Sequence, residues 1–269
     1  MDHVMSGLRI ALWQTGSADL EGLRSRAAEA SGRGARLLIT PEAFTTGYNV
    51  PGLADRAQPA DGPWLAEIGA IAREKGIAIL YGYPEQVGEA VHNSAQLVDR
   101  DGQVLARYRK SHLYGELDRR TFTPGEGDFV VADLDGVRVG ILICYDVEFP
   151  EAVRALALAG ADLIAVPTAL MRPYEVVART VVPARAYENQ VYVAYANRSG
   201  TEAGLTYCGE SCVATPSGDL LARAGDGDEL IFADIDRERL AELRAENTHL
   251  RDRRPALYGA LTRAEENSR

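Results

Sequence analysis

The chain has 269 residues, 46% hydrophobic and 25% charged, which suits one large or two small globular α/β domains. The net charge of −10 argues against a nucleic-acid or anionic-membrane surface, and no stretch nears the roughly 20 apolar residues of a membrane span. Three cysteines are too few for a disulfide framework, and residues 1–7 lack a signal-peptide pattern, so we expect a cytoplasmic protein.

Helical and extended patterns alternate along the chain. Single strands are expected at residues 8–13, 36–40, 77–83, 162–167, 191–196 and 230–235. Helices are expected at residues 19–32, 64–75, 174–189 and 236–246, and in the stretch that follows Cys144. Asp19 and Asp236 are suited to cap helices, and Pro183 should divide the helical stretch around it.

Turn signals interrupt this alternation. Hairpins are expected to join residues 93–99 to 103–109, 129–134 to 137–143 and 211–215 to 219–224. Residues 43–62 and 111–128 have no clear period and are expected to be loops. Helices mixed with hairpins favour a layered α/β sandwich with mixed sheets over an all-parallel sheet.

Cys144 lies where an apolar strand ends and a helix, with Pro150 in its first turn, is about to begin. Free backbone N–H groups at such a junction would favour the thiolate and could hold an oxyanion. This predicts a nucleophile. The alternative, a buried structural cysteine, is the more common fate of a lone cysteine.

Three polar residues stand at the ends of expected strands: Glu42, Lys110 and Cys144. If these strands are sheet neighbours, the three side chains meet at one edge. A carboxylate could then take the thiol proton, and an ammonium could stabilise an oxyanion during acyl transfer. The alternative is a structural Glu–Lys ion pair beside an inert cysteine.

Other sites find less support in the sequence. The four histidines are scattered, so no metal site is expected. His112 could form a Cys–His dyad with Cys144, although a local hydrogen-bonding role is favoured for it. Cys208 and Cys212 are four residues apart, but no second pair of ligands accompanies them, so they are expected to be packing residues.

Three phrases carry a family resemblance. Residues 41–44 (PEAF), 108–113 (YRKSHL) and 143–151 (ICYDVEFPE) resemble, in that family's order, the signatures of the nitrilase, or carbon–nitrogen hydrolase, superfamily. The similarity extends from Ile10 to about Ile235. It implies a four-layer αββα sandwich with mixed sheets, no cofactor, and homodimers or higher homo-oligomers that stack across an interface near the cysteine-bearing helix.

The resemblance also implies roles for single residues. Glu42 would be the base, Lys110 the oxyanion support and Cys144 the nucleophile, with the backbone N–H of Tyr145 as second oxyanion donor. Residues 1–246 would form the hydrolase domain. For the tail, residues 247–269, two alternatives stay open: it wraps a partner subunit, or it is partly disordered.

The motif around Cys144 is most similar to the amidase branch, which implies a small-molecule carboxamide substrate. A second carboxylate is expected in the loop after Lys110, and Asp118 is preferred to Glu116. Side chains in loops that could contact substrate are Tyr48, Tyr114, Glu116, Thr168 and Ala169. A nitrilase, an N-carbamoyl hydrolase and a non-catalytic binding module of the same fold remain the alternatives.

Overall fold

The computed structural model describes residues 7–262, which form two six-stranded sheets and one small two-stranded sheet. The first large sheet has the order β14 (Glu229–Asp236), β1 (Gly7–Gln14), β2 (Leu37–Ile39), β3 (Ala78–Val87), β4 (Ala90–Val98) and β5 (Val104–Arg109). The second has the order β13 (Leu220–Arg223), β12 (Cys212–Ala214), β9 (Tyr192–Ala196), β8 (Leu163–Pro167), β7 (Val137–Ile141) and β6 (Val131–Leu134).

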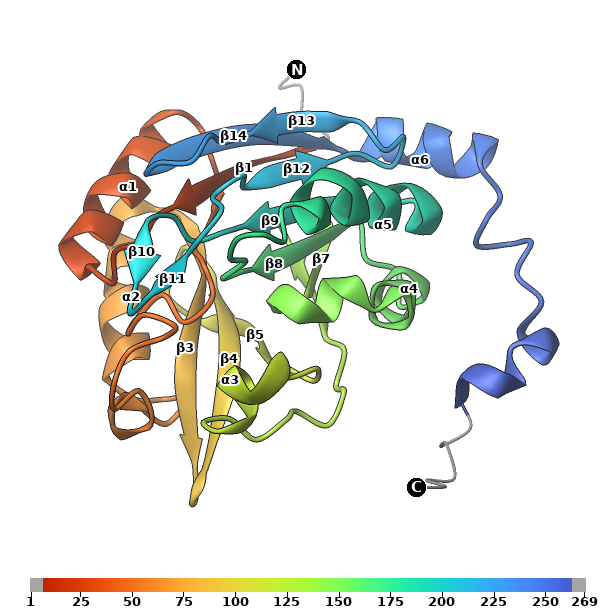
Figure 1. The fold of residues 1–269 in the computed structure, drawn as a ribbon. Coiled ribbons are helices and arrows are strands. Elements are labelled where there is room, and N and C mark those ends of the chain that lie inside the picture. Colours follow the sequence, from red (N-terminus) through yellow and green to blue (C-terminus); the bar gives the residue numbers. More distant parts are fainter. Residues whose placement is uncertain (1–6, 263–269) are drawn as a thin grey trace, which may run out of the picture.

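The two sheets pack face to face and helices cover their outer faces, as Figure 1 shows. Along β1, Ile10 and Leu12 join the core between the sheets, whereas Ala11 and Trp13 pack with α1 (Leu20–Gly32) and α2 (Pro63–Lys75). On the second sheet, α4 (Pro150–Leu158) and α5 (Val182–Asn189) pack against the core. Because side chains of a strand alternate between faces, each sheet separates two apolar layers. The predicted sandwich fold is confirmed.

Both sheets are mixed, as predicted. Strands β1, β2 and β3 are parallel, and so are β7, β8 and β9. The predicted hairpins β4–β5, β6–β7 and β12–β13 are antiparallel. The parallel strands direct their carboxyl ends to one edge of each sheet, which is where sites form in α/β folds.

Helix ends follow the predicted capping residues. Asp19 accepts hydrogen bonds from the N–H groups of Glu21 and Gly22, and Asp236 accepts one from Arg239 at the start of α6 (Arg237–Glu246). Pro183 lies in the first turn of α5, directly after a π-helical turn at Val177–Val181. The helical stretch is therefore divided near the proline, where the backbone lacks an N–H donor.

Two local predictions were wrong, and one element was missed. The strand expected to stop near Pro84 continues as β3 to Val87, because β4 pairs with it to that end and Gln58 hydrogen-bonds to its other edge at Pro84 and Gln86. The loop expected at 111–128 contains the helix α3 (Gly115–Arg119). A small hairpin, β10 (Thr201–Glu202) with β11 (Leu205–Thr206), went unpredicted. In the loop 43–62 only Ala54–Arg56 form a short helical turn.

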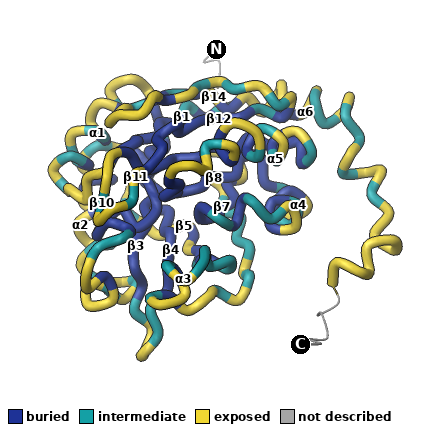
Figure 2. Tube along the Cα trace, in the orientation of Figure 1, coloured by how far each residue is buried: buried dark blue, intermediate teal, exposed yellow. Residues whose placement is uncertain are grey.

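After α6 the chain leaves the sandwich. Residues 247–262 contain a turn at Thr248–Asp252 and two short 3₁₀-helices, Pro255–Leu257 and Gly259–Thr262, and their outer part is exposed, as Figure 2 shows. The predictions made for residues 1–6 and 263–269 lie outside the described residues. Among those described, no helix has both the length and the apolar character needed to cross a membrane.

Candidate active site

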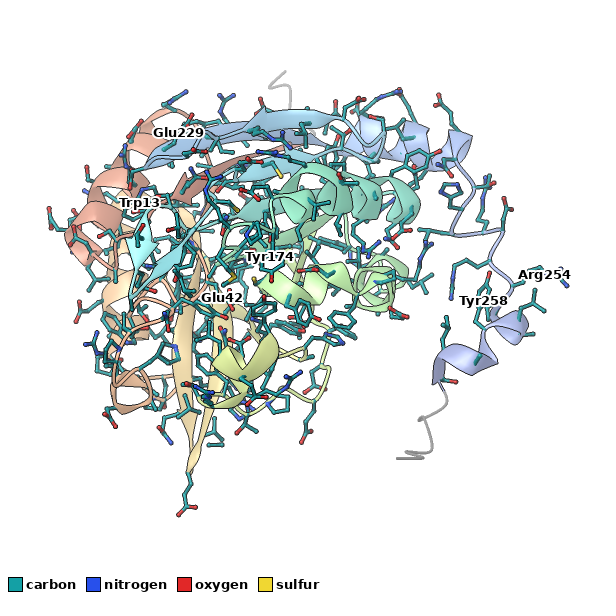
Figure 3. The ribbon with its side chains drawn as sticks, viewed as in Figure 1. Trp13, Glu42, Tyr174, Glu229, Arg254 and Tyr258 are labelled. Carbon is teal, nitrogen blue, oxygen red and sulfur yellow. The ribbon has the colours of Figure 1, made fainter. Side chains whose placement is uncertain are left out.

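Glu42 lies in the loop after β2 and is fully buried; Figure 3 labels it in the interior of the fold. The backbone of Glu42 is held on both sides. The Glu42 N–H donates to the carbonyl of Thr168 at 3.3 Å, and the Arg198 side chain donates to the carbonyl of Glu42 at 3.3 Å. On the side of β3, a Cβ at Gly82 would meet the Ala43 nitrogen at 2.6 Å. Only glycine allows this close approach, which places Glu42 against the sheet.

Lys110 follows β5 and is also fully buried. Its Nζ donates to Oε1 of Glu42 at 2.7 Å and to Oδ2 of Asp118 at 2.6 Å. Burial opposes the ammonium, but the two carboxylates outweigh burial and raise the pKa of Lys110 well above its usual value. The lysine is therefore a permanent cation between two carboxylates.

Asp118 is carried by α3 and is buried. Besides Lys110, its carboxylate accepts hydrogen bonds from the Tyr48 hydroxyl at 2.7 Å and the Tyr114 backbone N–H at 2.8 Å. Three donors thus orient Asp118, and Asp118 in turn orients Lys110. The other carboxylate of α3, Glu116, has a side chain 73% exposed to solvent and does not contact Lys110.

Asn93 on β4 is the second group that holds the Glu42 carboxylate. Its Nδ2 donates to Oε1 of Glu42 at 2.7 Å, so Asn93 and Lys110 share this oxygen. The other oxygen, Oε2, has no hydrogen-bond partner within residues 7–262. Burial raises the pKa of Glu42, and Asp118 adds to this, against the opposing effects of Lys110 and the Cys144 thiol.

Cys144 begins a short helical turn, Cys144–Glu148, directly after β7. Its φ of 47° is a left-handed conformation that a side chain rarely adopts and that costs free energy at functional sites. The prediction of a favoured thiolate was wrong, because burial and the Glu42 carboxylate raise the pKa of the thiol well above its usual value. The opposing effects of Lys110 and the Ala169 backbone are smaller.

The three side chains meet, but not by the predicted route. Glu42 and Lys110 follow β2 and β5 of the first sheet, and these strands are separated by β3 and β4. Cys144 follows β7 of the second sheet. They are therefore not neighbours in one sheet: face-to-face packing brings the carboxyl ends of strands from both sheets together.

A cavity of about 250 Å³ opens above Cys144. Its lining is aromatic and apolar apart from the thiol and one carboxylate, and consists of Tyr48, Tyr114, Cys144, Tyr145, Glu148, Ala169, Leu170, Met171 and Tyr174. This size suits a small molecule. The thiol thus borders a small cavity and lies near the Glu42 carboxylate and the Lys110 ammonium.

Comparison with known proteins agrees with this geometry. The profile of the carbon-nitrogen hydrolase family matches residues 9–245. The chain is 48% identical over 265 residues to a hydrolase from the pqqF 5′ region of Pseudomonas protegens, covering 95% of this chain and 92% of that one. It is 38% identical over 229 residues to an (R)-stereoselective amidase of Pseudomonas, covering 84% and 82%. The chain belongs to the carbon-nitrogen hydrolase family.

A solved amidase from Nesterenkonia has the same fold as this carbon-nitrogen hydrolase, with a TM-score of 0.86, 37% identity, and coverage of 96% of this chain and 97% of that one. One structure of that amidase carries the acetamide moiety of fluoroacetamide on its active-site cysteine. The chain described here is thus a hydrolase that acts on carbon–nitrogen bonds, in the amidase-like branch of the nitrilase superfamily.

Some of the predicted substrate contacts line the cavity, and others do not. Tyr48, Tyr114, Tyr145 and Ala169 line the cavity. Thr168 is fully buried outside it, and its hydroxyl donates to the carbonyl of Val166 at 3.1 Å. Glu116 lies at the surface, as described above. A one-residue difference along a turn decides between lining and burial, and sequence patterns do not resolve this.

The remaining candidates have local partners. His112 binds the carboxylate of Asp146 through Nδ1 at 2.8 Å and stacks on Phe149, so its ring is held away from a dyad. Cys208 and Cys212 are buried and free. Within residues 7–262, no three His, Cys, Asp or Glu side chains are grouped as metal ligands would be.

Several site residues escaped the sequence analysis: Asn93, Glu148, Tyr174 and Glu202. The signal for Asn93 was a run of polar residues, Asn93, Ser94 and Gln96, in an expected strand that proves to be buried. Glu202 on β10 accepts hydrogen bonds from the backbone N–H groups of Tyr48 at 2.9 Å and Asn49 at 2.6 Å. It thereby holds the loop that carries Tyr48 over the site.

Proposed function

We propose that this protein is an amidase that hydrolyses small carboxamides to a carboxylic acid and ammonia through a thioester on Cys144. The observation that carries the proposal is the position of the Cys144 thiol, next to the Glu42 carboxylate and facing the small cavity. The adduct in the Nesterenkonia amidase supports a nucleophilic role for the corresponding cysteine.

Acylation begins with a proton transfer. Glu42 takes the proton of Cys144 as sulfur attacks the amide carbon, which gives a tetrahedral oxyanion. Because the pKa of the thiol is raised, the thiolate forms during the attack rather than beforehand. Glu42 returns the proton to the leaving nitrogen, the carbon–nitrogen bond breaks, and ammonia departs.

Two donors hold the oxyanion in this scheme. Lys110 supplies its ammonium, and Tyr145 supplies its backbone N–H, which lies in the first turn of Cys144–Glu148 where N–H groups have no intrahelical partner. Water then attacks the thioester, with Glu42 as base. The carbon–sulfur bond breaks, the acid leaves, and the proton returns to sulfur.

The supporting residues keep this arrangement in place. Asn93 and Lys110 both bind Oε1 of Glu42, which leaves Oε2 free to exchange the proton. Asp118 fixes Lys110 on its other side and is the second carboxylate of the site. These roles make Asn93 and Asp118 positioning residues.

We also propose a homodimer in which residues 247–269 extend from the hydrolase domain, residues 1–246, onto a partner subunit. Figure 3 shows Arg254 and Tyr258 on a segment that stands apart from the sandwich. Leu257 and Leu261 in this segment are 62% and 66% exposed, so both are accessible for packing against a second chain.

The test is ammonia release from small aliphatic amides, amino-acid amides, N-carbamoyl acids and nitriles, with Cys144→Ala as the control. We expect release from amides, abolished in the variant. A 38% identical relative from Pyrococcus abyssi is named a nitrilase, so release from nitriles alone would replace the amidase proposal by that alternative. A folded protein that releases no ammonia and resists a thiol-directed electrophile would favour a non-catalytic module.

A further inference from the structure

Four of the nine residues that line the cavity are tyrosines. Tyr114, Tyr145 and Tyr174 form one corner: the rings of Tyr145 and Tyr174 meet that of Tyr114 edge-on, with centroids 5.4 Å and 6.2 Å away and interplanar angles of 77° and 73°. Tyr48 adds a fourth ring. Aromatic faces carry partial negative charge, and groups of rings set at steep angles bind cations such as ammonium ions.

Glu148 provides a formal negative charge in the same cavity. Of the residues in the range 7–262 that line the cavity, it is the only ionisable acid or base apart from the thiol and the tyrosine hydroxyls. Its carboxylate makes no hydrogen bond or ion pair to any residue in the range 7–262, although it is half-buried. A carboxylate in such a position is costly unless a ligand pairs with it.

The nearest cations are already engaged. Arg185 donates to the backbone carbonyls of Val147 and Glu148 at 3.0 Å and 2.7 Å and to the side chain of Glu188 at 2.9 Å. Lys110 is held by two other carboxylates. Burial raises the pKa of Glu148 despite the opposing charges of Arg185 and Lys110, as expected for an acid without a direct partner.

Among the described residues, no arginine, lysine or histidine lines the cavity. An acyl group that carries its own carboxylate would meet Glu148 with no cation to receive it. A neutral acyl group would leave Glu148 unpaired. An acyl group that carries an ammonium would satisfy both the carboxylate and the aromatic faces.

We propose that the cavity selects carboxamides whose acyl group carries a protonated amine, as in amino-acid amides, and that Glu148 is the specificity-determining residue that pairs with this amine. The inference rests on the proposed amidase function and names its substrate class. Glu148 takes no part in the proton transfers; it places the ammonium against the tyrosines while the amide carbon faces Cys144.

The test compares substrates in which an ammonium replaces a methyl group of the same size. Alaninamide, as both enantiomers, is paired with isobutyramide, and β-alaninamide with butyramide. In the wild-type enzyme we expect kcat/KM for the cationic member of at least one pair to exceed that of its neutral partner by about tenfold or more.

Three variants make the test specific. Glu148→Gln should lower kcat/KM for the cationic member and bring the ratio close to one, and Glu148→Asp should keep a preference because it keeps the charge. Glu151→Gln, a change at an exposed residue of α4, should leave the ratio as in the wild type. Thermal unfolding of each variant shows whether it is folded.

Two outcomes count against the inference in different ways. Equal turnover of neutral and cationic members in the wild type, or an unchanged ratio in Glu148→Gln, would overturn the substrate class and leave the amidase proposal standing. Ammonia release from no member of either pair would refute the amidase function for these substrates, and the inference with it.

Discussion

Lys110 and Asp118 form a fully buried ion pair, with 2.6 Å between Nζ and Oδ2. Because the pair has no contact with solvent, Asp118 determines where the lysine charge stands relative to Glu42 and the cavity. Removing one charge of a buried pair leaves the other uncompensated and displaces it.

We therefore expect Asp118→Asn to lower kcat on any accepted amide by about 10²-fold or more, the effect of losing an aligned oxyanion donor. Steady-state kinetics of ammonia release would measure this. Glu116→Gln, in the same short helix but with an exposed side chain, is the matched control and should keep wild-type rates. Equal effects of both changes would show that α3 matters only for folding.

Gly82 is predicted to be irreplaceable by alanine. A Cβ there would lie 2.6 Å from the nitrogen of Ala43 and 2.9 Å from the carbonyl oxygen of Pro41, both backbone atoms that cannot rotate away. We expect Gly82→Ala to cost about 1–3 kcal/mol in free energy of unfolding and to lower activity by moving Glu42.

Urea unfolding and kinetics on the same samples would test this prediction. Gly32→Ala provides the control, because a Cβ at Gly32 in α1 meets no atom within 4 Å. It should be neutral or slightly stabilising. Unchanged stability and activity in Gly82→Ala would mean that the Glu42 loop is free to shift.

Glu202 anchors the loop that carries Tyr48. We expect Glu202→Ala to leave two backbone N–H groups without their acceptor, to cost about 1–3 kcal/mol in stability, and to lower kcat/KM through Tyr48 and Asp118. Tyr207→Phe removes only the hydroxyl donor to the same carboxylate and should cost less. Denaturant unfolding would rank the two variants, and the reverse order would contradict this role for Glu202.

The acid side of the pH profile should report on Glu42. The proposed base works only when it is deprotonated, and burial raises its pKa above the usual 4.5. Hydrolysis should therefore be present above this raised pKa and lost as pH falls through it. The apparent pKa of this loss belongs to Glu42, Lys110 and Asp118 together, because their charges interact.

The profile of kcat/KM against pH would locate this acid limb. Circular dichroism at each pH, and recovery of activity at neutral pH, would separate protonation from unfolding. An acid limb at or below 4.5 would be inconsistent with Glu42 as a buried base.

The tail should control assembly. Light scattering is expected to give twice the chain mass for the whole protein and a lower mass for the double variant Leu257→Asp, Leu261→Asp. Val104→Asp changes another exposed apolar residue, 43% accessible on β5, and should not alter the mass. A monomeric wild-type protein would contradict the proposed dimer.

Much of the fold followed from local patterns. The caps at Asp19 and Asp236, the break at Pro183 and the hairpin turns depend on neighbouring residues only, and the structure agrees with each. The exceptions, such as the continuation of β3 beyond Pro84, depend on which strand lies alongside, and local sequence does not encode that.

The site likewise depends partly on local sequence and partly on tertiary packing. The sequence by itself determined the three reactive residue types at strand ends, Glu42, Lys110 and Cys144, and through its motifs the family. Only the tertiary structure decided that Cys144 reaches the other two from the opposite sheet, that Asp118 rather than Glu116 binds the lysine, and that Asn93 and Glu148 belong to the site. The physical reason is that proximity and burial, which set the pKa values of these groups, arise from packing between segments far apart in the chain.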